Sequence, residues 1–464
     1  MMRPEQSSMS SRDEHSETDE THESRRGGKS RLHLTAWAAA DKALPMLYGV
    51  AVLLMPLKVL STEEFGVWTA FQAVFLSISL IGDYFLLQPM VKLASEHGSD
   101  ERPIVTAAML LYIAISLLFA APLTLFPAFF SDIFKTGAHG TLAFTWLAAT
   151  IVATLLRNVS IRLLQIDYRI TRIFLLDLVY FGGFVALMVA GRLRGDLDGS
   201  IDMVHYNLIA LAVSSLVGVV LSGRKILPSF RRTVDAARQI VTIGAHQGGT
   251  GVMTIAQQNF DVLIVSGTRG SIAAGTYSFA RIFYRTFEAL REAAQLLLIS
   301  ATSHAYSRDD VERVQDITVM ATAALVAILY PAIIILMIAA PIGIPMIKEE
   351  YASSVSIFQW LIASGFAMPF IIVPAAVLLG IGKTRELFRG MAIGTAVLLA
   401  AGLALTYLMG PTGMAIGVLL GNTTTALLLT RKMDLYIDFS IRAVLTRSRG
   451  LGSLVRQRIR DFRS

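Results

Sequence analysis

The feature that most constrains the fold of this chain is a succession of long apolar stretches between residues 33 and 432. A helix that crosses a bilayer needs about 20 mostly apolar residues. The stretches therefore predict an all-α polytopic membrane protein with twelve transmembrane helices. The predicted spans are residues 36–60, 66–91, 104–129, 141–163, 172–191, 203–222, 239–266, 272–302, 318–346, 353–381, 388–409 and 412–431.

The composition excludes several classes of protein. Hydrophobic residues make up 54% of the 464 residues and charged residues 16%, against about 45–50% and about 25% in soluble domains. A soluble multidomain enzyme is therefore excluded. The chain has no cysteine, which removes disulfides, thiolate metal ligands and thiol catalysis. We expect no catalytic residues, no metal site and no cofactor.

The chain divides into five segments. Residues 1–31 are polar and charged, which predicts a disordered cytoplasmic tail. Residues 32–222 and 239–432 are predicted six-helix bundles, and residues 223–238 are the cytoplasmic linker between them. Residues 433–464 are basic, with apolar residues at helical spacing. They predict an amphipathic helix on the anionic inner membrane surface, or alternatively a helix that binds a partner.

Basic residues alternate from loop to loop. Fifteen lie in the even-numbered loops between the predicted spans, and the odd-numbered loops hold only Lys135, Arg192, Arg194, Arg269 and Lys348. Cytoplasmic loops are enriched in lysine and arginine. The alternation therefore predicts that both termini are cytoplasmic.

The two halves resemble each other at an offset of 209 residues. Gly66 at the start of the second span corresponds to Gly275 at the start of the eighth, and Asp83 corresponds to Glu292. Both halves start in the cytoplasm, so the predicted repeat is parallel, with its axis along the membrane normal. Transporters built in this way place their binding site between the halves. We therefore expect a central cavity there.

The eighth predicted span has an unusual polar face. A charge at a helix centre costs about 2.5–3.5 kcal/mol on insertion scales, so this face should meet a solvated cavity or partner charges on other helices. Arg281 and Arg285 are like charges four residues apart, a spacing that favours a bound anion. At 100° per residue the face holds Tyr277, Arg281, Arg285, Glu288 and Glu292, with Arg291 beside it.

Polar residues also lie within the second, fourth and seventh spans, which suggests a cavity shared by both halves. The alternative is interhelical contacts that only hold the bundle together, each worth under about 1 kcal/mol. Two pairings are available, Arg157 with Asp83 and Arg291 or Arg285 with Glu292. The candidate substrate-binding residues are Arg157, Asn259, Asp261, Tyr277, Arg281 and Arg285, and the candidate gating or coupling residues are Asp83, Glu288, Arg291 and Glu292.

Several short motifs resemble the polysaccharide-transporter branch of the multidrug/oligosaccharidyl-lipid/polysaccharide (MOP) exporter superfamily. They are Phe65-Gly66-Val67-Trp68, Asp83, Leu163-Leu164-Gln165, Asn259-Phe260-Asp261 and the segment from Gly275 to Arg281. The resemblance extends over residues 33–432. Where that family has a Phe-Gly-Leu-type turn after the aspartate, this chain has Tyr84-Phe85-Leu86.

The resemblance implies a flippase of the bacterial inner membrane that moves a lipid-linked oligosaccharide or polysaccharide intermediate by alternating access. Arginines suit an anionic glycan, because guanidinium binds phosphate and carboxylate in a fork. The expected partners are this glycan, membrane lipids and other polysaccharide assembly proteins, with no nucleic acid. The alternatives are an ion-coupled drug or metabolite exporter of the same superfamily and a non-transporting component of a polysaccharide assembly complex.

Overall fold

The computed structural model describes residues 59–97, 101–230, 233–439 and 444. The predicted tail 1–31 lies outside the described residues, as do residues 36–58 of the predicted first span 36–60 and most of the predicted tail 433–464. The described part contains helices and no strand. Its elements are α3 (Thr62–Gly82), η1 (Asp83–Leu87), α4 (Gln88–His97), α5 (Arg102–Leu125), α6 (Pro127–Ile133), α7 (Gly137–Thr145), α8 (Leu147–Ile166), α9 (Ile170–Arg194), α10 (Ser200–Ser222), η2 (Gly223–Ile226), α11 (Thr233–Ile255), η3 (Ala256–Phe260), α12 (Asp261–Arg269), α13 (Ser271–Tyr306), α14 (Val311–Ile347), η4 (Glu349–Tyr351), α15 (Ser354–Ala363), η5 (Ser364–Ala367), α16 (Pro369–Gly380), α17 (Thr384–Met409) and α18 (Pro411–Asp434).

These helices confirm the all-helical membrane fold. Eight helices of the described part are long and apolar enough to cross a membrane, or nine if the bent pair α15–α16 is one span. Each of the predicted spans from the second to the twelfth coincides with a helix or a broken helix. The helices α11 and α13 are not among the eight. The reason is that polar and charged residues, such as Arg281 and Arg285 on α13, lower their hydropathy.

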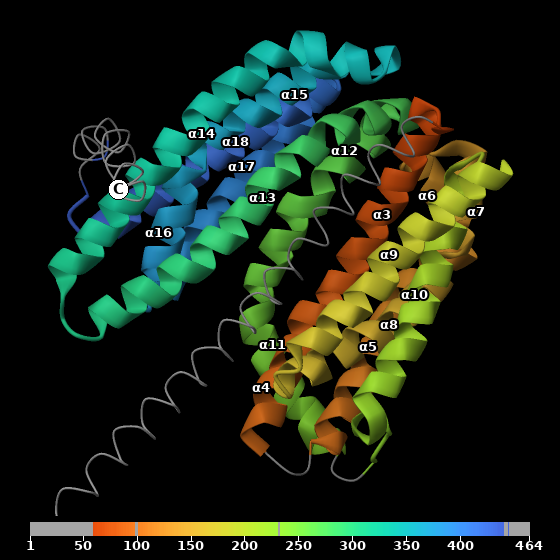
Figure 1. Ribbon diagram of the computed structural model, residues 1–464, viewed down its shortest axis with the longest axis horizontal. Coiled ribbons are helices and arrows are strands. Elements are labelled where there is room, and N and C mark those ends of the chain that lie inside the picture. Colours follow the sequence, from red (N-terminus) through yellow and green to blue (C-terminus); the bar gives the residue numbers. More distant parts are fainter. Residues whose placement is uncertain (1–58, 98–100, 231–232, 440–443, 445–464) are drawn as a thin grey trace, which may run out of the picture.

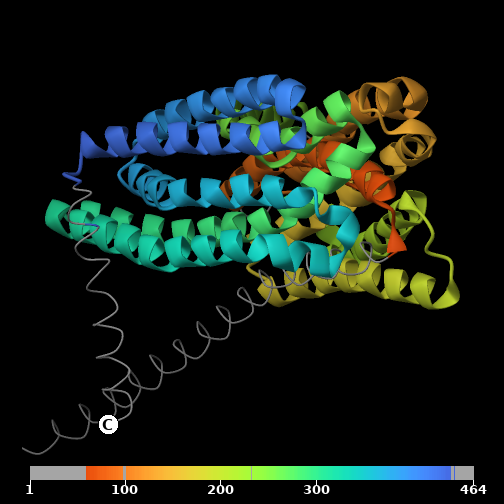
Figure 2. The same cartoon turned by 90° about the horizontal axis from the view of Figure 1, so that it is seen from above.

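The helices form two groups (Figure 1). Helices α3 to α10 make one group, which we call the N-lobe, and α13 to α18 make the other, the C-lobe. The seventh span, α11–η3–α12, connects them: α11 packs against α5 and η1 of the N-lobe, whereas α12 packs against α13 and α17 of the C-lobe. Seen from above, α17 and α18 cover one side of the C-lobe and α13 and α14 lie on the other (Figure 2).

Two spans contain short π-helices. The segment η1 begins at Asp83 and η3 covers Ala256 to Phe260. Such segments are rare and occur often at functional sites. Helix α11 begins at Thr233, within the predicted linker 223–238. A helix can start there since the apolar residues of this stretch recur at helical spacing.

One end of the molecule, which we call the predicted outer face, joins the two lobes. It contains the starts of α3 and α13, which cross closely (Figure 1). A Cβ on Gly66 would lie 1.8 Å from the carbonyl oxygen of Ser271, and a Cβ on Gly275 would lie 2.1 Å from that of Thr62. Only glycine permits so close an approach of two helix backbones.

Hydrogen bonds reinforce this junction between the lobes. Lys348 Nζ donates to the Leu60 carbonyl at 3.1 Å, and Thr62 Oγ1 donates to Glu350 Oε2 at 3.1 Å. Nearby, Lys135 Nζ donates to the Thr268 carbonyl at 2.7 Å. From this junction the helices of the two lobes diverge toward α4 and the α13–α14 turn (Figure 1).

Candidate functional site in the C-lobe

The most buried charged group of the described chain lies where α12 meets α13. Asp261 is the first residue of α12, directly after the π-helix η3, and only 2% of it is exposed. Its Oδ2 accepts a hydrogen bond from Arg281 Nε at 2.5 Å and another from Tyr277 Oη at 2.9 Å. The other oxygen accepts from the Val262 amide at 2.8 Å. The carboxylate is therefore paired and hydrogen-bonded on both oxygens.

The guanidinium of Arg281 is bound on two sides. Besides Asp261, its Nη2 donates to the carbonyl of Gln258 at 2.5 Å and to that of Gln257 at 3.4 Å. Both carbonyls belong to η3, so the π-helix supplies acceptors to a neighbouring helix. A buried ion pair of this kind costs about 3–5 kcal/mol when one partner is removed, because the other charge stays buried.

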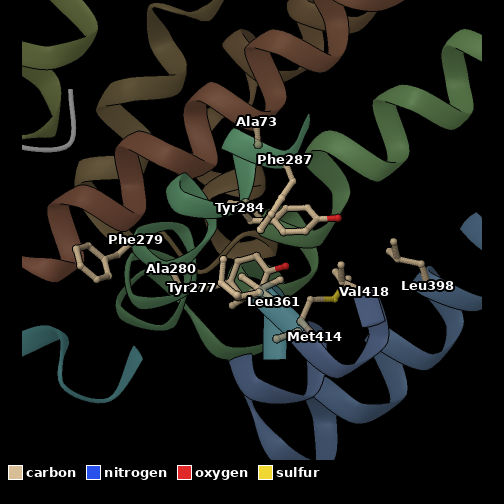
Figure 3. Packing of buried hydrophobic residues seen from close by; sticks show 14 of the residues in the cluster. Ala73, Tyr277, Phe279, Ala280, Tyr284, Phe287, Leu361, Leu398, Met414 and Val418 are labelled. Atoms are coloured by element: carbon tan, nitrogen blue, oxygen red, sulfur yellow. The ribbon is translucent and has the colours of Figure 1, made fainter. Parts of the chain in front are cut away.

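A small polar cavity of about 30 Å³ lies beside this ion pair, between η3 and helices α13, α16, α17 and α18. Asn422 Nδ2 donates to Tyr284 Oη at 2.7 Å, and Gln257 Nε2 donates to Thr395 Oγ1 at 2.7 Å. The cavity is lined by Gln257, Gln258, Asp261, Tyr284, Arg291, Met368, Ile371, Met391, Leu398, Val418, Asn422 and Thr425. Figure 3 shows the phenol oxygens of Tyr277 and Tyr284 on the side where Leu398 and Val418 lie.

The structure thus brings together three predicted substrate-binding residues, Asp261, Tyr277 and Arg281. A fourth, Asn259, is 3% exposed, and its side-chain nitrogen has no hydrogen-bond partner among the described residues. Sequence reasoning missed Asn422 and Tyr284. An asparagine in mid-span was the available signal for Asn422, since lipid-buried amides need hydrogen-bond partners.

The other two arginines of α13, Arg285 and Arg291, differ in their exposure. Arg285 is exposed and makes an interaction with its surroundings. Arg291 is half-buried and lines the cavity. The side chains of Glu288 and Glu292 lie outside the described part, so the predicted pairing of Glu292 with Arg291 or Arg285 stays a prediction.

In the N-lobe, the predicted pairing of Arg157 with Asp83 is wrong. Asp83 pairs with Arg162, whose Nε and Nη2 donate to the two carboxylate oxygens at 2.9 and 2.5 Å. Arg157 instead pairs with Asp177 of α9, and its guanidinium lies 4.6 Å from the ring centre of Tyr180. The two arginines are five residues apart on α8, which turns them by about 140° around the helix axis. They therefore face different neighbours.

Gln88 completes the Asp83 site. Its Nε2 donates to Asp83 Oδ2 at 3.3 Å, and Arg162 also donates to Gln165 at 2.8 Å. Arg162 lies at the end of the predicted fourth span, 141–163, and was not among the candidate site residues. Helix α8 continues to Ile166, so Arg162 lies within the helix. Helix α8 therefore supplies two ion pairs to the N-lobe.

Comparisons with known proteins give the class and then the family. Solved structures of similar fold are transporters of the MOP superfamily. An inward-facing multidrug resistance MATE family transporter matches with a TM-score of 0.68 at 17% identity, over 85% of this chain and 94% of that chain. The lipid II flippase MurJ in an inward closed conformation matches with a TM-score of 0.69 at 13% identity, over 91% of each chain.

The family assignment rests on the sequence. The model of a family described as polysaccharide biosynthesis protein matches residues 58–379, which is more than half of the chain. This chain therefore belongs to that family and has the fold of MOP superfamily transporters. No curated protein matches it significantly. An outward-facing MATE family transporter also matches, with a lower TM-score of 0.57 at 16% identity, over 85% of this chain and 94% of that chain.

Proposed function

We propose that this protein is a flippase of the bacterial inner membrane. It moves a lipid-linked oligosaccharide or polysaccharide intermediate outward by alternating access, for the synthesis of a surface polysaccharide. The observation that carries the proposal is the match to the polysaccharide biosynthesis family over residues 58–379, on a fold shared with a lipid II flippase.

The junction of the lobes supports alternating access. The lobes meet through the α3–α13 crossing and the contacts of Lys348 and Glu350, all at the predicted outer face. In the proposed cycle this is the inward-facing state, in agreement with the higher TM-score to the inward-facing MATE structure than to the outward-facing one. Outward opening then requires these contacts to break.

The charged residues receive different roles in this proposal. Arg285 is exposed and is the proposed contact for an anionic group of the glycan, because an exposed guanidinium can bind phosphate or carboxylate in a fork. Asp261, Tyr277 and Arg281 hold α12 against α13, so that the C-lobe moves as one unit. Asp83 and Arg162 connect α8 to η1 and are the proposed gating pair of the N-lobe.

A second candidate is an exporter of small molecules, which the MATE fold favours. Cation coupling through Asp261 is disfavoured, because Arg281 already neutralises that carboxylate. Arg285 on α13 would also repel a cationic drug, because both carry positive charge.

The decisive experiment is a flipping assay in proteoliposomes with a fluorescent lipid-linked oligosaccharide. The variant Thr62→Cys/Glu350→Cys, cross-linked by a short bismaleimide, should stop flipping because it holds the predicted outer face closed. The same variant without cross-linker is the control, in a chain that has no native cysteine. If the wild-type protein without cross-linker does not flip the lipid-linked oligosaccharide but exports small drugs, the protein is an exporter of small molecules and the flippase proposal is wrong.

A further inference from the structure

Arg291 is a charged residue that the proposed cycle does not use. It lies on α13, it is half-buried, and it lines the C-lobe cavity. Among the described residues it makes no ion pair and no side-chain hydrogen bond. A guanidinium stays charged at any physiological pH, and a charge held between membrane helices is costly without a counter-charge.

The described charges around the cavity leave a net positive charge. Asp261 is the acidic residue of the lining, and its negative charge is compensated by Arg281 at 2.5 Å. Arg291 then contributes one positive charge that no described carboxylate offsets. An anion in the cavity would supply the missing counter-charge.

Hydrogen-bond donors in the lining point to the same conclusion. Most polar side chains of the cavity bond to one another or to the backbone: Gln257 bonds to Thr395, Asn422 to Tyr284, and Thr425 Oγ1 to the Gly421 carbonyl. The side-chain amide of Gln258 has no hydrogen-bond partner in the described part of the chain. Gln258 and Arg291 are therefore the donors available to a ligand.

The size of the cavity limits the ligand. About 30 Å³ is available to a water-sized group, and one water needs about 10–15 Å³ by this measure. The space accepts a monatomic anion or one or two waters. A sugar or a phosphate ester is too large for it.

From charge, donors and size we propose that the C-lobe cavity binds one small monovalent anion such as chloride, held by Arg291 and Gln258. The anion neutralises the interior of the C-lobe where η3, α13 and α18 meet. The site stands independently of the transported molecule, because the cavity is too small to hold a glycan.

The test is binding of radioactive chloride to the purified full-length protein in detergent, measured by equilibrium dialysis, with gluconate keeping the ionic strength constant. We expect one chloride per chain in the wild type and at least a tenfold loss of affinity in Arg291→Gln. The matched control Arg313→Gln removes the same charge from the exposed start of α14 and should bind like the wild type. Wild-type protein that binds no chloride, as expected if a carboxylate of α13 neutralises Arg291, would overturn the proposal. Unchanged binding by Arg291→Gln would overturn it as well.

A second measurement covers the case in which Arg291→Gln does not fold. Crystals of the wild type grown in bromide should show one anomalous peak within hydrogen-bond distance of the Arg291 guanidinium and the Gln258 amide. Arg291→Lys keeps the charge and should retain weaker bromide binding at the same place. A wild-type crystal without a peak in this cavity would refute the site.

Discussion

Gly66 and Gly275 lie backbone to backbone where α3 crosses α13: a Cβ on Gly66 would lie 2.9 Å from the Gly275 nitrogen, and a Cβ on Gly275 would lie 3.1 Å from the Gly66 nitrogen. The two residues are 209 positions apart, the offset at which the two halves resemble each other. Equivalent residues that touch must lie near the axis relating their halves. The same crossing that marks the repeat also joins the lobes at the predicted outer face.

The crossing predicts the effect of enlarging either glycine. Gly66→Val should destabilise the state in which the lobes meet at this face, by about 1–3 kcal/mol as for other overpacked contacts. Reactivity of a cysteine at Thr62 toward a membrane-impermeant maleimide should therefore increase. Gly183→Val on α9 is the control, because a Cβ at Gly183 meets nothing within 4 Å. Equal reactivity in the two variants would argue against a closing role for the glycine contact.

The buried ion pair of the C-lobe predicts strongly non-additive mutations. Asp261→Asn or Arg281→Gln alone should destabilise the protein by about 3–5 kcal/mol, because each leaves one buried charge. The double variant should lose less than the sum, since no unpaired charge remains. Thermal unfolding in detergent, followed by tryptophan fluorescence, measures the difference. Additive effects would mean that the two side chains do not interact.

The ion pair between Asp83 and Arg162 in the N-lobe predicts that Arg162, and not Arg157, acts together with Asp83. Asp83→Asn and Arg162→Gln should give the same loss of flipping per folded molecule, because each breaks the same contact. Arg157→Gln, which removes the partner of Asp177, should lower the folded yield without that shared defect. Flipping normalised to folded protein separates the outcomes. Full flipping by both Asp83→Asn and Arg162→Gln would make their pair purely structural.

The contact of Glu350 at the predicted outer face should persist throughout the range from pH 8 to 5. Hydrogen bonds from Lys348, and then from Thr62, lower the pKa of Glu350 below its ordinary value of 4.5. A lowered carboxylate pKa means that the contact is present above pH 4.5 and is lost as the pH falls through the still lower value in the folded state. A cysteine at residue 62 would remove the hydrogen bond from Thr62 to Glu350. The reporter is therefore a cysteine that replaces the neighbouring Glu63. The rate at which this cysteine reacts with an impermeant maleimide, divided by the rate for free cysteine at the same pH, should stay constant from pH 8 to 5. A change between pH 7 and 6 would point to another group.

The proposed orientation can be tested with single cysteines in a chain that has none. Asp198→Cys and Glu349→Cys, both exposed at the predicted outer face, should react with an impermeant maleimide added outside intact spheroplasts. Ser307→Cys, at the α13–α14 turn, should react only after lysis. The reverse pattern would invert the topology.

The sequence by itself determined the helical membrane fold, the position of most spans and the existence of a charged face on α13. These properties are local, because about 20 apolar residues form a spanning helix wherever they lie. Glycines 209 residues apart also indicated the repeat before any contact was known.

Only the tertiary structure decided which charges meet. Arg157 and Arg162 differ by 140° around α8, so the rotation and depth of the helix assign one to Asp177 and the other to Asp83. Arg281 looked available for a substrate, yet the π-helix η3 places Asp261 and two backbone carbonyls against it. Hydropathy sets which segments enter the membrane, but pairing depends on the packing of helices far apart in the chain, and a single sequence contains no local signal for that packing.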